Sequence, residues 1–156
     1  MKKPLLPVVL MLLAGCNYEI PLSQTASSPA NPALNGIWIG SSSKDVPTPM
    51  EVKISGTDYF VIYGTSSNSL CFKGFEVKAN DLNLIQLELQ NAETSNKYLF
   101  VKYELTPDSL TVYQLNNDVV SAKCQTPEEL LADITVHRNN PFLFSEPMKF
   151  TRSAPQ

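Results

Sequence analysis

The chain has 156 residues, enough for one domain with a hydrophobic core but too few for two of ordinary size. Its formal charge is −3, with 12 basic and 15 acidic residues, and no basic patch is interleaved with aromatic residues. This composition argues against a nucleic-acid partner, because phosphate binding needs clustered Lys and Arg. A single small domain with a mildly acidic surface is expected.

The first residues have the layout of an export signal. Lys2 and Lys3 precede a short apolar run from Leu5 to Leu13, as in a secretory signal peptide. The run is about half of the roughly 20 residues that a membrane-spanning helix needs, and Pro7 lies inside it. A transmembrane anchor is therefore the weaker interpretation.

The signal ends at Leu13-Ala14-Gly15-Cys16, which resembles the lipobox of bacterial lipoproteins. The resemblance implies that residues 1–15 are removed and that Cys16 carries several acyl chains, palmitate among them, as a permanent lipid anchor. Asn17 stands where an aspartate marks retention at the inner membrane in Gram-negative lipoproteins. The resemblance thus implies an outer-membrane protein that faces the periplasm.

Residues 16–35 are expected to form a flexible, lipid-anchored linker. Pro21, Pro29 and Pro32 interrupt a polar background that has almost no periodic apolar residues, so the segment offers little to bury. As a random coil it would span about 25 Å, and about 60 Å in a polyproline conformation. The linker would then hold the folded domain, residues 36–153, away from the bilayer.

Two further cysteines, Cys71 and Cys124, lie in the domain. Disulfides persist outside the cytoplasm, so a bond between them is the favoured expectation, with two buried reduced thiols as the alternative. A metal site is not expected, because His137 is the only histidine and no close Cys/His spacing occurs. No other cofactor is indicated.

Short alternating runs separated by turn residues predict a β-rich domain. No proline occurs between Glu51 and Thr106, as the interior of a sheet requires. In one run the apolar phase shifts between Leu84 and Ile85, which predicts a β-bulge. About eight such strands are typical of a barrel or sandwich. The predicted strands are 36–40, 51–54, 59–63, 71–78, 82–89, 98–105, 110–115 and 119–123.

One helix is predicted late in the chain. Thr126 is a suitable N-cap, Pro127 suits the first helical position, and Glu129 completes a capping box. The helix is expected to pack on the sheet through a narrow apolar stripe, and a final strand follows at 148–152. The predicted fold is therefore mostly β: a single antiparallel up-and-down β-barrel, or barrel-like domain, with one short C-terminal helix packed on it.

Three features in this order resemble the lipocalin and related calycin barrels. Gly36-Ile37-Trp38 opens the first strand, the helix comes late, and Arg152 ends the last strand. In that family the glycine-x-tryptophan strand closes one end of the barrel and an arginine packs across the tryptophan ring. The resemblance implies a structural pair of Trp38 and Arg152 at the barrel end. An ordinary core role for Trp38 is the alternative.

The sequence carries no recognisable catalytic motif, and Asp133 with His137 has the spacing of a surface pair on a helix. We therefore expect no enzyme but a lipoprotein that binds a protein partner in the cell envelope. A lipocalin-like carrier of a small apolar ligand is the alternative, and a purely structural envelope protein is a third candidate. Aromatic residues in the middle of the chain would line the ligand pocket or, as we favour, fill the interior. They are Tyr59, Phe60, Tyr63, Phe75, Tyr98, Phe100, Tyr103 and Tyr113.

Overall fold

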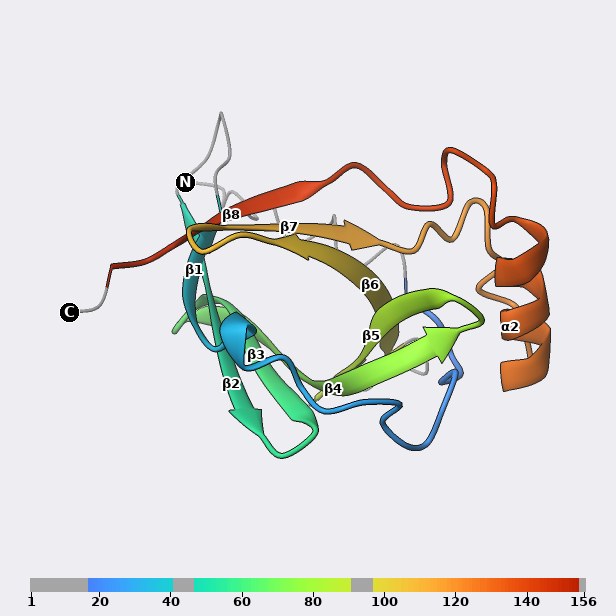
Figure 1. The fold of residues 1–156 in the computed structure, drawn as a ribbon, viewed down its shortest axis with the longest axis horizontal. Helices are drawn as coiled ribbons and strands as arrows, with labels where there is room; N and C mark the ends of the chain where they lie inside the picture. Colours follow the sequence, from blue (N-terminus) through green and yellow to red (C-terminus); the bar gives the residue numbers. More distant parts are fainter. Residues whose placement is uncertain (1–16, 41–46, 91–96, 155–156) are drawn as a thin grey trace, which may run out of the picture.

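The computed structural model describes residues 17–40, 47–90 and 97–154, so the export signal and Cys16 lie outside the described residues. The described chain is a closed antiparallel barrel of eight strands with a short helix beside it (Figure 1). Each strand pairs with the next, and β8 closes the ring by pairing with β1. The predicted up-and-down barrel is confirmed. The strands are β1 (Gly36–Gly40), β2 (Thr48–Ser55), β3 (Asp58–Thr65), β4 (Asn68–Ala79), β5 (Leu82–Leu89), β6 (Tyr98–Leu105), β7 (Ser109–Gln114) and β8 (Met148–Arg152).

Alternation along each strand separates the barrel interior from its outer wall. In β6, Leu99, Val101, Tyr103 and Leu105 belong to the interior cluster, as the period-two pattern predicts. Phe100 points the other way and is fully buried in a second apolar cluster. The protein therefore has two apolar clusters, one inside the barrel and one on its outer wall.

The apolar phase shift in β5 does not come from a bulge. This strand pairs with β4 and with β6 in an unbroken register. Ile85 and Leu87 pack in the interior cluster, whereas Leu84 is buried in the second cluster on the outer wall. The strand is apolar at adjacent positions because both of its faces are covered. The predicted bulge is wrong.

The second cluster forms where α2 (Pro127–Val136) lies against β4. Leu130 and Ile134 of the helix are buried there. Thr126 caps the helix as predicted by accepting the N–H of Glu129 at 3.1 Å, while the Glu129 carboxylate accepts the N–H of Gln125, the residue before the cap, at 2.8 Å. No helix among the described residues has the length and hydropathy to cross a bilayer. The cluster also takes in Tyr18, Val77, Leu84, Phe100, Leu115 and Val120.

The prediction of a strand at 119–123 is wrong, because these residues form turns between β7 and α2. The carbonyl of Asn116 accepts the N–H groups of Val119 and Val120 at 3.1 and 2.9 Å. Val120 is fully buried in the second cluster. The apolar residues of this segment thus pack in that cluster, and β8 takes the eighth place in the barrel.

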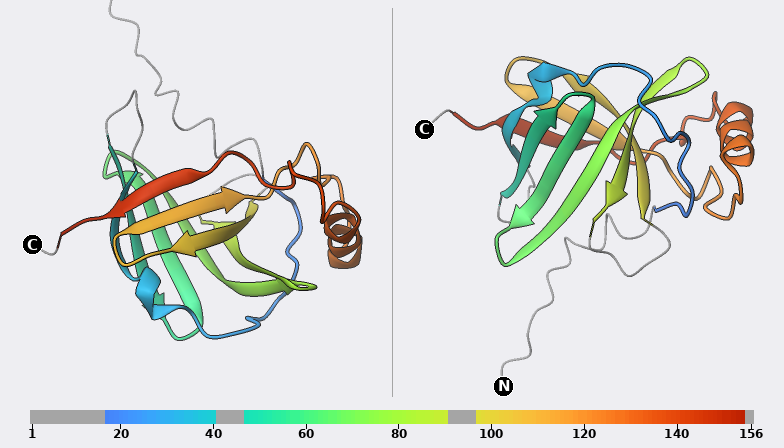
Figure 2. Two further views of the ribbon diagram at one scale, coloured as in Figure 1. Left: turned by 45° about the horizontal axis from the view of Figure 1, so that its top comes forward. Right: turned by 90° about the horizontal axis from the view of Figure 1, so that it is seen from below.

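The expectation of a flexible linker is wrong for residues 17–35, which we call the N-terminal strap. The strap crosses the barrel from the side of α2 to the start of β1 (Figures 1 and 2). At one end Tyr18 is buried and pairs with Tyr98 of β6. At the other end Leu34 is buried in the 3₁₀-helix η2 (Pro32–Leu34). The folded domain therefore includes the strap and does not begin at residue 36.

The strap docks largely through main-chain groups. The side-chain oxygen of Gln86 accepts the N–H groups of Leu22 and Ser23 at 2.7 and 3.2 Å, and its amide donates to the Ser23 carbonyl at 2.9 Å. The N–H of Ser27 donates to the carbonyl of Glu76 at 2.8 Å. Because every residue except proline offers these backbone groups, a segment without apolar periodicity can still be fixed to the barrel.

Candidate functional site

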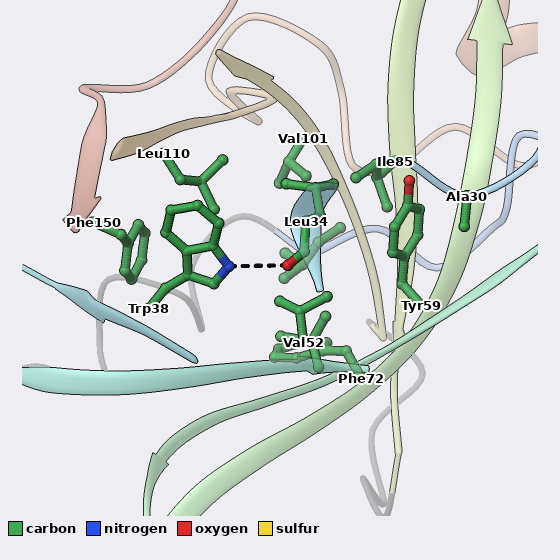
Figure 3. Packing of buried hydrophobic residues seen from close by; sticks show 12 residues of the cluster. Ala30, Leu34, Trp38, Val52, Tyr59, Phe72, Ile85, Val101, Leu110 and Phe150 are labelled. Carbon is green, nitrogen blue, oxygen red and sulfur yellow. Dashed lines mark hydrogen bonds between the residues drawn. The ribbon is translucent and has the colours of Figure 1, made fainter. Parts of the chain in front are cut away.

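Trp38 closes one end of the barrel interior. It is 0% exposed and lies among Leu34, Leu110 and Phe150 (Figure 3). Its indole N–H donates to the Leu34 carbonyl at 3.0 Å, so the buried ring has its polar group satisfied. The strap therefore supplies both an apolar neighbour and a hydrogen-bond acceptor to the tryptophan.

Arg152 packs on the same ring. Its guanidinium carbon lies 4.1 Å from the centre of the Trp38 ring, within the range of a cation–π contact. The guanidinium also donates to the carbonyls of Ala33, Asn35 and Pro107 at 2.7, 3.0 and 3.0 Å. The structure thus brings together the pair that the resemblance implied, and Arg152 also joins the strap to the turn between β6 and β7.

Gly36 is required by this arrangement. Its φ of 135° lies in the region that favours glycine. A Cβ atom at this position would lie 3.1 Å from Nη1 of Arg152. The glycine that precedes Trp38 by two residues therefore permits both the backbone path and the approach of the arginine.

Four polar residues meet at the edge of the interior: Glu76, Tyr59, Tyr103 and Asn31. The carboxylate of Glu76, which is 8% exposed, accepts the hydroxyl of Tyr59 at 2.6 Å and that of Tyr103 at 3.5 Å. The backbone N–H of Asn31 donates to the Tyr59 hydroxyl at 2.6 Å, and its side-chain amide donates to the Tyr103 hydroxyl at 3.1 Å. A residue of the strap is thus joined to a carboxylate of β4 through two tyrosines.

Burial in this network raises the pKa of Glu76, Tyr59 and Tyr103. Burial raises the pKa of the Glu76 carboxyl, and the hydrogen bonds from Tyr59 and Tyr103 oppose that shift. Burial and the bond to Glu76 raise the pKa of Tyr59, which keeps its hydroxyl protonated as a donor. Within the described part of the chain Glu76 has no salt bridge. The network therefore stabilises the carboxylate by hydrogen bonds alone.

The raised pKa of Glu76 predicts a loss of stability as the pH rises. The folded state binds this proton more tightly than the unfolded state, so the free energy of unfolding falls as the pH climbs from the ordinary value of 4.5 through the raised folded pKa. Glu76→Gln should flatten that part of the profile, as measured by urea unfolding at a series of pH values. Equal pH profiles for the two proteins would show that Glu76 titrates normally.

The interior beside this network is largely filled by side chains. Among the described residues a cavity of about 70 Å³ with an apolar lining lies between η2 and the barrel wall. Ligand sites usually measure about 300–1,000 Å³, so this cavity is too small for a carrier. The aromatic residues are divided between the two faces of the wall. Tyr59, Tyr63 and Tyr103 pack inside, and Phe75, Tyr98 and Phe100 pack in the second cluster.

Comparison of the chain with family models, with curated proteins and with solved structures finds no match. Within the described residues, no group of three or more His, Cys, Asp or Glu side chains is arranged to hold a metal ion. His137 and Asp133 lie 3.2 Å apart at the end of α2. Asp133 also accepts the N–H of Ser121 at 2.7 Å, so this pair joins the helix to the preceding loop.

The expected disulfide is absent, since Cys71 and Cys124 are both free thiols. Cys71 lies on β4 opposite Ile62, whereas Cys124 packs in the second cluster. A disulfide needs Cα atoms within about 7 Å, and Cys71 is not a member of the second cluster in which Cys124 packs. Burial raises the pKa of the Cys124 thiol, which lowers its reactivity.

The outer wall of β1 to β3 carries three large apolar side chains, Ile37, Phe60 and Ile62, which are 48, 40 and 39% exposed. We call them the outer-wall patch. Glu51 is the cross-strand partner of both isoleucines, which places these about 10 Å apart. Lys73 lies over the Phe60 ring, 5.8 Å from its centre. The patch therefore mixes apolar and charged groups: the carboxylate of Glu51 lies between the two isoleucines, and Lys73 lies at Phe60.

One feature of the sequence indicates this patch, although it does not fit the alternation of apolar and polar residues that is expected of a half-buried strand. Residues 59–63 are apolar at five consecutive positions. In β3, Tyr59 and Val61 are buried in the interior, while Phe60 and Ile62 point outward and are exposed. A strand that is apolar on both faces needs a cover on each. Among the described residues nothing buries this part of the outer wall.

Proposed function

We propose that this chain is a non-catalytic lipoprotein of the outer membrane, whose barrel faces the periplasm and binds a protein partner through the outer-wall patch. The lipobox at residues 13–16 and the asparagine that follows it support the anchor and its membrane. The observation that carries the binding role is the exposed patch on a barrel whose interior is filled. Binding by such a barrel takes place on its surface.

The patch has the composition of a small protein-binding surface. Protein interfaces combine apolar side chains with charged and polar groups, and here Glu51 lies between Ile37 and Ile62 while Phe60 lies beside Lys73. Glu51 forms a salt bridge with Lys53 at 3.3 Å beside the isoleucines. The described strands form a closed ring, so a partner would bind to side chains and not extend the sheet at an open edge.

A carrier function is the second candidate from the sequence, and the interior argues against it. The cavity of about 70 Å³ lies well below the volume of ligand sites, roughly 300 Å³ or more. The polar groups beside this cavity belong to the Glu76 network, and their tyrosine hydroxyls already accept hydrogen bonds from Asn31 of the strap. We therefore place binding on the outer wall.

Site-specific crosslinking in the living envelope tests the proposal. A photoreactive phenylalanine analogue replaces Ile62 in one protein and Thr111, which faces outward from β7, in a matched control. We expect one dominant adduct with an envelope protein from position 62 and none from position 111. Phe60→Asp in the same chain should remove that adduct while the circular dichroism of the protein is retained.

Two results would overturn the proposal. Equal labelling at positions 62 and 111, or an adduct that persists with Phe60→Asp, would show that the patch does not bind a partner. Membrane fractionation tests the anchor separately: Cys16→Ser should release the protein from the outer membrane, and normal fractionation of that variant would exclude lipid attachment at Cys16.

A further inference from the structure

Tyr18, two positions after the proposed lipid site, is fixed to the barrel. Tyr18 is 1% exposed, and its backbone N–H and carbonyl pair with Tyr98 at 2.8 and 3.0 Å. Its hydroxyl donates to the carbonyl of Val120 at 3.0 Å. Two peptide units link Cys16 to Tyr18, and they span at most about 7 Å. A lipid on Cys16 would therefore hold the barrel directly at the bilayer, with no flexible segment between the barrel and the membrane.

The loop that receives Tyr18 also bonds to the segment after α2, which carries the exposed ring of Phe142. Val120 donates its N–H to the carbonyl of Asn116 at 2.9 Å, and the Asn116 side chain donates to the carbonyl of Phe142 at 3.0 Å. The N–H of Phe142 donates to the Asn140 side chain at 2.8 Å. The ring of Phe142 is 70% exposed although its backbone is held on both sides. Two hydrogen bonds thus hold the backbone of Phe142 in place while its ring is exposed to solvent.

A groove of about 500 Å³ lies beside this ring, lined by residues of β5, β6, β7 and the segment after α2. Lys102 extends over two aromatic rings there, with its Nζ 4.7 Å from the centre of Tyr113 and 4.5 Å from that of Phe144. Within the described residues Lys102 forms no salt bridge. An ammonium group on aromatic rings beside an exposed apolar side chain suits the boundary between lipid headgroups and acyl chains.

We propose that this surface, made of Phe142 and the groove with Lys102, Tyr113 and Phe144, docks on the lipid bilayer itself. We call it the docking face. The proposal rests on lipid attachment at Cys16, which is part of the proposed function. The bilayer is the occupant because the anchored end of the strap is joined to the same loop that holds Phe142. Phe142 enters the acyl region, and Lys102 meets the phosphate groups.

The docking face would orient the barrel. Val136, at the end of α2, is 78% exposed and lies on the same side of the molecule as the segment that carries Phe142. Strands β1 to β3 lie on the far side of the barrel from α2 (Figures 1 and 2). Docking through Phe142 therefore turns the outer-wall patch away from the membrane, toward a partner in the periplasm.

Quenching of tryptophan by brominated lipids tests the orientation. The full lipidated protein is reconstituted in vesicles of phosphatidylethanolamine and phosphatidylglycerol with brominated acyl chains. Trp38 is the only native tryptophan and is 0% exposed, so it serves as an internal reference. We expect bromine to reduce the emission of Phe142→Trp, and to leave that of the matched control Ile62→Trp at the level of the parent protein.

The outcomes separate docking from anchoring. If the protein floats with the vesicles but Phe142→Trp is no more quenched than Ile62→Trp, docking is wrong and the anchor stands. If quenching is stronger for Ile62→Trp, the barrel has the opposite orientation and the proposal is overturned. A blue-shifted but unquenched emission from Phe142→Trp would mean burial against a second copy, which also overturns it. Failure of the protein to float would instead contradict the lipid anchor of the proposed function.

Discussion

Replacing Trp38 with alanine should lower the free energy of unfolding by about 3–5 kcal/mol, the cost of removing a large buried aromatic side chain. The ring is fully buried, its N–H is bonded to Leu34, and Arg152 lies on its face. Its loss would leave a cavity at the barrel end and an arginine without its aromatic partner. Unfolding in guanidinium chloride of the chain that begins at Asn17, without the lipid anchor, measures this change in free energy.

The same experiment should show that Trp38 and Arg152 act together. Arg152→Ala removes the cation–π contact and three hydrogen bonds to carbonyls, which should cost about 2 kcal/mol. The double variant should lose less than the sum of the single variants, because each change removes part of what the other residue contacts. Lys53→Ala, at an exposed surface pair, is the control and should change stability by less than about 0.5 kcal/mol. Strict additivity would show that the two residues are independent.

Removal of the strap should be still more damaging. A chain that begins at Gly36 lacks the buried side chains of Tyr18 and Leu34, the acceptor of the Trp38 indole, and two of the carbonyls that bind Arg152. Loss of one such buried side chain costs about 2–5 kcal/mol, and the whole stability of a small domain is about 5–15 kcal/mol. We expect this chain to be unfolded by circular dichroism, while the chain that begins at Asn17 folds.

Point variants keep this prediction testable if the shorter chain merely aggregates. Tyr18→Ala should lower the free energy of unfolding by about 3–5 kcal/mol, and Tyr18→Phe by about 1 kcal/mol, because the latter loses only the bond to the Val120 carbonyl. The exposed strap residue Gln24 provides the control, and Gln24→Ala should have no measurable effect. Equal unfolding midpoints for Tyr18→Ala and Gln24→Ala would mean that the strap does not stabilise the barrel.

The candidate sites were only partly predictable, and Glu76 shows why. In β4 the apolar Phe75 and Val77 alternate with Glu76 and Lys78, a pattern that ordinarily puts the carboxylate on the solvent side. In the structure Glu76 is bonded to Tyr59 of the interior, while Phe75 and Val77 pack in the second cluster. Alternation separates the two faces of a strand but does not say which one the barrel encloses. The cover that α2 and the strap provide reverses the usual assignment.

Periodicity, turn residues and capping predicted the mostly β class, about eight barrel strands and the late helix, because each of these depends on neighbours in the chain. The contact between Trp38 and Arg152 was implied only by the resemblance to lipocalins. That residues 17–35 are a docked strap, that Cys71 and Cys124 are not bonded, and that the outer-wall patch is exposed emerged only from the folded structure. The physical reason is that these features depend on contacts between segments distant in the chain. Main-chain hydrogen bonds that fix the strap, in particular, leave no trace in side-chain pattern.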